Sequence, residues 1–271
     1  MKNLQNLHPH CRYCDGADST EEMVLAAIEK GFDSLGFSCH SPMFFSPTAG
    51  VSPTGILLYR ESVALLKKKY ADKIKLYCGL EVEMLSNPPM DGYDYLIGSV
   101  HYFKFGNRYV GFDRNAQTVK KVIDEEFSGD GMKYAVTYYE YLSQLPQYGK
   151  FDIIGHFDLI TKHCENESFF DTESKIYRDA ALSAAHALAG KIPFFEVNTG
   201  AISRKNRTTP YPQKFILKEL KALGFGAIIS SDCHNKNFLD CGFDDARELL
   251  AECGFSERFI LTDSGFRAVE L

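Results

Sequence analysis

The chain lacks long hydrophobic runs, and no apolar stretch approaches the ~20 residues that a helix needs to span a bilayer. Its opening residues, MKNLQNLHPH, lack the apolar core and the cleavage site of a secretory signal peptide. These absences argue against a membrane-spanning or secreted protein. We therefore expect a cytoplasmic protein with no membrane partner.

An excess of positive charge is also absent, since the formal net charge is −6 and the sequence pI is about 5.8. Nucleic-acid binding would need clustered lysine and arginine. The dense basic stretches are Lys67–Lys69, which suits a helix C-terminus, and Ser203–Arg207, which follows a strand and could face an anion. We expect a small-molecule partner and no nucleic acid, and the oligomeric state stays open.

Paired cysteine motifs are scarce. The eight cysteines are scattered, and several lie inside apolar runs, as expected of reduced core thiols. Cys11 and Cys14 form a C-x-x-C, but no second pair completes a zinc ribbon, and a thioredoxin-like motif would open a helix in a much shorter domain. Redox chemistry is therefore disfavoured.

The chain does have a regular alternation of strand-like and helical patterns. Strands are expected at Leu4–His8, Ser34–Cys39, Ile74–Leu80, Tyr93–Val100, Phe151–Gly155, Pro193–Val197, Gly226–Ser230 and Arg258–Thr262. Helices are expected at Thr20–Lys30, Gly55–Tyr70, Asn115–Phe127, Tyr134–Leu145, Thr172–Ala189, Pro212–Leu223 and Asp244–Cys253. Continuous apolar strands between amphipathic helices indicate a mostly parallel α/β sheet. No repeat or linker divides the chain, so we expect a single domain over residues 1–271.

Polar motifs follow nearly every one of these strands. The candidate ligands are His8, His10, Asp15, His40, Glu81, His101, His156, Asp232 and His234. Imidazole and carboxylate are ligands of Zn, Mn and Fe, and a His-x-His on a strand directs both rings to one face. Each histidine alone would be interpreted as a hydrogen-bonded core residue, but so large a polar cluster is costly to bury without metal or water. An open sheet gathers ligands from two or three strands, whereas a closed barrel brings six strand ends together.

The ordered motifs H-x-H, a later acid, a strand-end His, G-L-E, S-V-H, G-H-x-D and S-D-x-H resemble the polymerase and histidinol phosphatase (PHP) superfamily. The strings GFDSLGFSCHSP, LYCGLEVE and FFEVNTGA are similar to its histidinol-phosphate phosphatase branch. The resemblance implies a single PHP-type metal-dependent phosphatase domain. Its fold would be a distorted TIM-like (β/α)7 barrel, with three divalent ions (Zn, Mn or Fe) at the C-terminal ends of the strands.

The resemblance also implies how the ligands divide. His8, His10, Glu81 and Asp232 would hold one ion, Glu81, His101 and His156 a second, and Asp15, His40 and His234 a third. Asp15 stands where some relatives use histidine. Glu83 is expected to support the ligands rather than to bind metal.

The activity implied is hydrolysis of L-histidinol phosphate to L-histidinol and inorganic phosphate in histidine biosynthesis. A hydroxide held between two ions would attack phosphorus, with Glu81 and Asp232 as catalytic residues. The alternatives are a PHP phosphoesterase with another substrate and a non-catalytic metal-binding PHP module.

Substrate contacts are expected from two loops and three side chains. The loops are residues 41–54 and 102–113, each of which follows a candidate ligand. Arg204 could clamp two phosphate oxygens. Lys162 and His163 lie close enough to a ligand strand to reach substrate. For all three side chains, an exposed residue without a role is the alternative.

Overall fold

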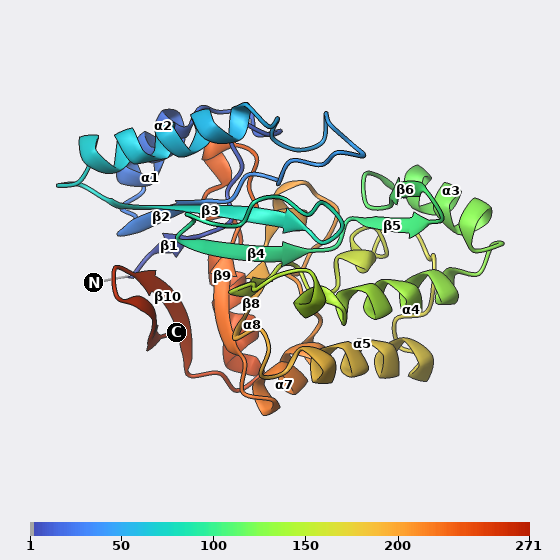
Figure 1. The fold of residues 1–271 in the computed structure, drawn as a ribbon. Helices are drawn as coiled ribbons and strands as arrows, with labels where there is room; N and C mark the ends of the chain where they lie inside the picture. Colours follow the sequence, from blue (N-terminus) through green and yellow to red (C-terminus); the bar gives the residue numbers. More distant parts are fainter. Residues whose placement is uncertain (1–2) are drawn as a thin grey trace.

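A computed structural model describes residues 3–271 and shows seven parallel strands in a nearly closed barrel surrounded by helices (Figure 1). The barrel strands, in spatial order, are β1 (Gln5–Asn6), β2 (Ser34–Phe37), β3 (Lys75–Glu83), β4 (Tyr95–Ser99), β7 (Ile153–Ile154), β8 (Phe194–Asn198) and β9 (Gly226–Ser230). Between the first and last strands, the His10 N–H donates to the Cys233 carbonyl over 2.8 Å. The expected distorted (β/α)7 barrel is confirmed.

Seven of the helices that the structure describes fall close to the ranges predicted from periodicity, and a short one at Gly200–Ser203 was not predicted. The helices are α1 (Thr20–Glu29), α2 (Gly55–Lys69), α3 (Ala116–Glu126), α4 (Gly131–Leu142), α5 (Lys175–Leu188), α6 (Gly200–Ser203), α7 (Lys214–Ala222) and α8 (Phe243–Glu252), with 3-10 turns η1 (Leu145–Gln147), η2 (Leu159–Thr161) and η3 (Lys236–Phe238). Helices α1 and α2 lie along one side of the barrel, and α5 and α7 lie along the other (Figure 1). No helix within residues 3–271 combines the length and apolarity needed to cross a membrane.

Local side chains explain where several helices begin and end. Ser19 forms a capping box with Glu22, in which the Ser19 hydroxyl accepts from the Glu22 N–H and the Glu22 carboxylate accepts from the Ser19 N–H. Asp130 caps α4 earlier than the apolar pattern alone predicts. Gly31 and Gly224 follow α1 and α7 with φ of 74° and 82°, a left-handed conformation that suits glycine.

A small apolar cluster fills the barrel interior. Tyr95 is fully buried there with Ile97, Ile153 and Ile228, and its hydroxyl donates to the carbonyls of Leu7, which follows β1, and of Phe37 in β2. A larger core lies between the strands and the surrounding helices. One tyrosine of β4 therefore links across the barrel interior to β2 and to the end of β1.

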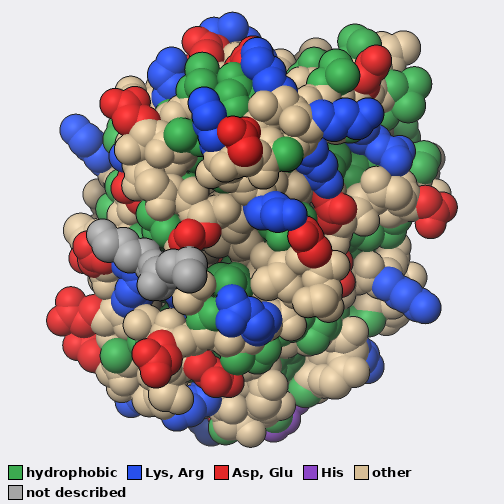
Figure 2. Space-filling model, turned by 90° about the vertical axis from the view of Figure 1, so that its left-hand side faces the viewer, with side chains coloured by type: hydrophobic (Ala, Val, Ile, Leu, Met, Phe, Trp, Pro, Cys, Tyr) green, Lys and Arg blue, Asp and Glu red, His purple; other side chains and the backbone are tan. Residues whose placement is uncertain are grey.

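The predicted strand at Arg258–Thr262 exists as β10 (Glu257–Thr262) but lies outside the barrel sheet. It pairs in antiparallel fashion with β11 (Gly265–Glu270), which was not predicted because only Val269 of this strand is buried and it contains no continuous apolar run. The Gln5 side chain accepts from the Leu261 N–H and donates to its carbonyl, fixing the hairpin at the N-terminal end of the strands. Acidic and basic side chains are interspersed on this end of the molecule (Figure 2).

The packing around Tyr95 predicts that Gly79→Ala will destabilise the barrel. A Cβ at Gly79 would overlap the Tyr95 ring, and overpacking of this kind costs about 1–3 kcal/mol. Urea unfolding should show a lower midpoint with an unchanged slope. Leu65→Ala, at an exposed site on α2, is the control and should shift stability by no more than about 0.5 kcal/mol. Equal midpoints for wild type and Gly79→Ala would contradict this packing argument.

Candidate metal centre

The Glu81 carboxylate lies at the centre of a cluster of histidines. Glu81 is on β3 and is only 1% exposed. Ring nitrogens of five histidines lie within 3.6 Å of its oxygens: His8 (3.4 Å), His10 (3.6 Å), His40 (2.7 Å), His101 (3.5 Å) and His156 (3.0 Å). A single carboxylate therefore contacts histidines from four separate segments of the sequence.

The parallel barrel explains this convergence. The apolar residues of each strand are buried, and the first polar residues after the strand emerge at a shared edge. His101, His156 and Asp232 each stand two positions beyond the last residue of β4, β7 and β9. His40 bridges directly to Glu81 in parallel register. The structure thus brings all the candidate ligands predicted from the sequence to one end of the barrel.

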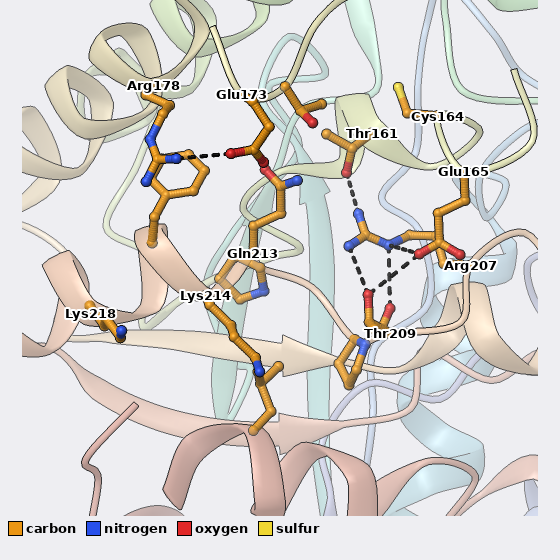
Figure 3. Close-up of a pocket in the computed structure, with 15 residues that line it drawn as sticks. Thr161, Cys164, Glu165, Glu173, Arg178, Arg207, Thr209, Gln213, Lys214 and Lys218 are labelled. Carbon is orange, nitrogen blue, oxygen red and sulfur yellow. Dashed lines mark hydrogen bonds and ion pairs between the residues drawn. The ribbon is translucent and has the colours of Figure 1, made fainter. Parts of the chain in front are cut away.

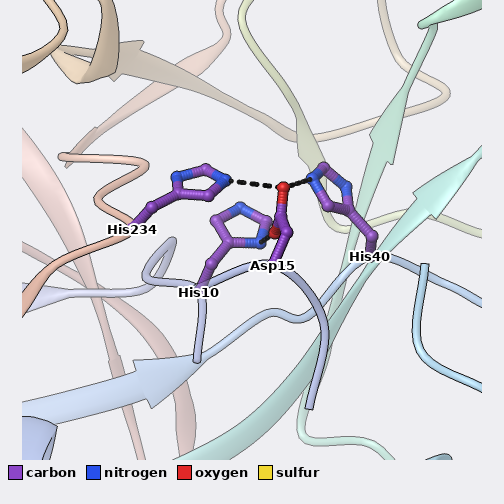
Figure 4. Close-up of side chains that lie close together, drawn as sticks. All are labelled: His10, Asp15, His40 and His234. Carbon is purple, nitrogen blue, oxygen red and sulfur yellow. Dashed lines mark ion pairs between the residues drawn. The ribbon is translucent and has the colours of Figure 1, made fainter. Parts of the chain in front are cut away.

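The ligand atoms form three overlapping groups, within each of which the atoms lie within 4.8 Å of one another. The groups are His10, Asp15, His40 and His234; His8, His10 and Asp232; and His40, Glu81 and His101. The first is drawn in Figure 4, where Asp15 stands between His234 (3.2 Å) and His40 (3.7 Å). His156 belongs to none of these groups, but its Nε2 lies 3.0 Å from Glu81 Oε1. His10 and His40 each belong to two of these groups, whereas the sets implied by the resemblance share only Glu81.

Unsatisfied buried atoms indicate that this cluster fits cations. His8 Nε2, His10 Nε2 and Glu81 Oε2 are buried and accept or donate no hydrogen bond within residues 3–271. His40 Nδ1 lies 2.7 Å from Glu81 Oε2, but the pair lacks the alignment of a hydrogen bond. Burial of such groups is costly unless something else pairs with them. Imidazole and carboxylate together suit Zn, Mn or Fe.

The electrostatics keep the carboxylates ionised. Burial opposes ionisation of Glu81, but the surrounding histidines, His40 and His8 foremost, hold the pKa of Glu81 well below its usual value. Burial likewise opposes ionisation of Asp232, and Arg204 does most to hold the pKa of that carboxyl well below its usual value. Both side chains therefore offer negative charge to a cation at neutral pH.

Two further buried glutamates orient the histidines. Glu196 on β8 places Oε2 2.8 Å from His8 Nδ1, while its Oε1 accepts from the His156 N–H, also over 2.8 Å. Glu83 accepts from the His101 N–H over 2.7 Å and lies 3.2 Å from His101 Nδ1. Such carboxylates fix the ring orientation and tautomer of a metal-binding histidine. This role was predicted from the sequence for Glu83 but not for Glu196, whose signal is its place in the string FFEVN.

A cavity of about 730 Å³ opens over the cluster. Arg204 lines it, with Nη2 3.0 Å from Asp232 Oδ2 and Nη1 3.1 Å from His234 Nδ1. Lys162 also lines it. His163 is not among the lining residues, and its Nε2 instead donates to the Asp113 carbonyl over 3.1 Å. Arg204 and Lys162 are thus placed to meet a ligand, whereas His163 supports the cavity wall.

Both loops expected to contact substrate reach this cavity. Residues 102–111 of one loop form a hairpin of β5 (Tyr102–Phe105) and β6 (Arg108–Gly111). From the other loop, Met43, Ser46, Thr48 and Ala49 line the cavity, as does Tyr102, whose hydroxyl donates to Ser46 Oγ over 3.1 Å. The Phe45 and Tyr109 rings stack with centroids 4.1 Å apart, which packs the loop against the hairpin.

All eight cysteines are free thiols, and several are buried as expected. Cys11 and Cys39 are fully buried with their sulfur atoms 3.3 Å apart. Cys14 Sγ lies 3.5 Å from His10 Nδ1, a contact that was not predicted from the sequence. The C-x-x-C therefore packs beneath the metal centre.

A second cavity, of about 570 Å³, lies outside the metal centre (Figure 3). Arg207 is buried in its wall, 4.4 Å above the Tyr211 ring, and donates to the Thr161 hydroxyl. Thr161 and Arg207 line this outer cavity, whereas Lys162 and Arg204 line the inner one. None of its lining residues belongs to the metal-ligand groups.

The contacts of Glu196 predict that Glu196→Gln will weaken metal binding about 10- to 100-fold. The amide cannot replace a charged acceptor for His8 Nδ1 and also keep its bond to the His156 N–H. Zinc affinity measured against a competing chelator checks this. Glu219→Gln is the matched control because Glu219 pairs with the exposed His186 over 2.8 Å. Wild-type zinc affinity in folded Glu196→Gln protein would show that Glu196 plays no such role.

Comparisons with known proteins agree with this architecture. The PHP domain model matches residues 6–200. A Schizosaccharomyces pombe protein named probable histidinol-phosphatase is 24% identical and covers 91% of this chain and 84% of its own length. The Bacillus subtilis histidinol-phosphatase is 24% identical over 84% of this chain and 92% of its own length. A solved Lactococcus lactis histidinol phosphate phosphatase, complexed with zinc, L-histidinol and phosphate, shares the fold with a TM-score of 0.72 at 18% identity, covering 98% and 99% of the two chains.

Proposed function

Because the chain belongs to the PHP domain family, we propose that it hydrolyses L-histidinol phosphate to L-histidinol and inorganic phosphate. The observation that carries the proposal is the Glu81 carboxylate among five imidazoles, with Arg204 beside it in one cavity. Curated relatives named histidinol-phosphatase, alignable over most of both chains, support the choice of substrate. The enzyme is accordingly a phosphoric monoester hydrolase.

We place three divalent ions, of Zn, Mn or Fe, in the cluster. One set of ligands is His8, His10, Glu81 and Asp232, the second is Glu81, His101 and His156, and the third is Asp15, His40 and His234. When bound, such ions supply positive charge for a phosphate dianion and lower the pKa of water toward neutrality. The Zn, L-histidinol and phosphate bound to the Lactococcus lactis protein are consistent with this assignment.

The chain's own residues bind and orient the ester. Arg204 is charged at neutral pH because Asp232 outweighs the effect of burial and raises the pKa of the guanidinium above its usual range. Its Nη atoms lie beside Asp232 and His234, so a phosphate above these residues would receive charge-assisted hydrogen bonds. Lys162 offers a second cation on the same wall. Glu81 has an oxygen toward each side of the cluster, as a carboxylate shared between two ions requires.

We assign this activity to one domain spanning residues 1–271, since strands from both ends of the chain close the same barrel and the β10–β11 hairpin packs on it. The cytoplasmic location and the absence of nucleic-acid and membrane partners stay predictions.

The first test is phosphate release from histidinol phosphate and from a panel of other monoesters. Chelated protein should be inactive, and protein reloaded with Zn, Mn or Fe should recover selective turnover of histidinol phosphate. If metal restores turnover of another ester alone, the substrate assignment is wrong but the metal-dependent phosphatase mechanism stands. No turnover with any metal would favour a non-catalytic metal-binding module.

A second prediction concerns the centre of the cluster. Glu81→Gln should lower kcat by at least about 10²-fold, because the amide removes the charge that five histidines surround. Circular dichroism should show an intact barrel, since Glu81 does not belong to the apolar interior. The same assay with exposed Glu173→Gln should give wild-type turnover. Retained activity in Glu81→Gln would refute the metal assignment.

A further inference from the structure

The inner cavity contains one carboxylate that the metal centre does not use. Among the described residues, four acids line the cavity: Asp15, Glu81, Asp113 and Asp232. Three of them belong to the candidate ligand groups, and Asp113 does not. Asp113 is therefore the lining acid whose negative charge is left for a ligand other than metal.

Asp113 is held rigidly at this position. It follows the β5–β6 hairpin, where the Phe112 N–H donates to the His101 carbonyl over 3.2 Å and Phe112 is fully buried against Phe103. His163 Nε2 donates to the Asp113 carbonyl. The backbone is thus fixed from both sides, and the carboxylate is placed without help from a ligand.

The Asp113 carboxylate keeps binding capacity. Its Oδ2 accepts from Lys162 Nζ over 2.8 Å, while no donor within residues 3–271 bonds to Oδ1. A carboxylate can accept several hydrogen bonds, so the pair with Lys162 leaves room for a second cation. The Asp113 side chain is 24% exposed and that of Lys162 is 12% exposed, as expected of groups at a cavity wall.

We propose that Asp113 binds the ammonium group of the substrate, and this inference rests on the proposed function. Histidinol phosphate carries a dianionic phosphate and, one carbon further along, a cationic amine. With the phosphate at the metal centre and Arg204, the amine needs an acceptor on the same wall that metal has not neutralised. Asp113 Oδ1 meets that need, and Lys162, bound to Oδ2, faces the phosphate. Asp113 is thereby the residue that distinguishes an amino-alcohol phosphate from other monoesters.

Asp113→Asn tests this assignment with two substrates that differ in a single group. Histidinol phosphate is compared with imidazolylpropyl phosphate, its counterpart without the amine, on metal-loaded enzyme. Wild type should prefer histidinol phosphate. The variant should lose about ten- to hundredfold of kcat/KM on histidinol phosphate, largely through KM. On the amine-free ester it should stay within about threefold of wild type.

The control is Glu173→Gln, because the exposed Glu173 carboxylate lines the outer cavity and pairs with Arg178. This variant should keep the wild-type kcat/KM on both substrates. Equal losses on both substrates would overturn the proposal, because Asp113 would then only hold Lys162 for the phosphate. Equal wild-type rates on the two esters would also overturn it. A wild-type enzyme active on other monoesters but not on histidinol phosphate would instead remove the proposed function, and this role with it. Asp113→Ser replaces Asp113→Asn if metal content or circular dichroism shows that the latter is misfolded.

Discussion

The structure of the barrel mouth depends on the charge of one buried carboxylate. Glu81 contacts five imidazoles that come from four strand ends, and each of those rings would be costly to bury without it or a cation. Glu196 and Glu83 hold the far nitrogens of His8 and His101. The mouth is therefore built in two layers, with acids on both sides of the imidazoles, so the rings are oriented before any ligand arrives.

This polar mouth stands on a small apolar interior. Tyr95 fills the space beside Gly79 and bonds to the backbone of two neighbouring strands, and the β10–β11 hairpin closes the opposite end through Gln5. Because the strands are fixed at this level, the residues that follow them have little freedom in where they emerge. Precision at the metal centre thus originates in packing several residues below it.

The sequence predicted the strands, and the polar residues that gather at their ends, because both leave a local pattern. An apolar run followed at once by histidine or an acid marks a strand end, whatever its partners are. The role of Glu196 could not be predicted, because its contacts with His8 and His156 join three strands that are distant in sequence. Three other features also depend on the folded geometry alone. They are the position of β11 outside the barrel, the contact of His163 with the Asp113 backbone, and the sharing of His10 between two ligand groups.

The two cavities are lined by residues that are close neighbours in the sequence. Thr161 faces the outer cavity and its neighbour Lys162 faces the inner one, and Arg207 and Arg204 divide in the same way. Neighbouring residues in contact seldom contribute independently to stability or binding. The effects of substitutions in the outer cavity on binding and stability are therefore expected to combine non-additively with those of substitutions at Arg204 and Lys162 in the inner one. Redesign of either cavity would then have to take account of the other.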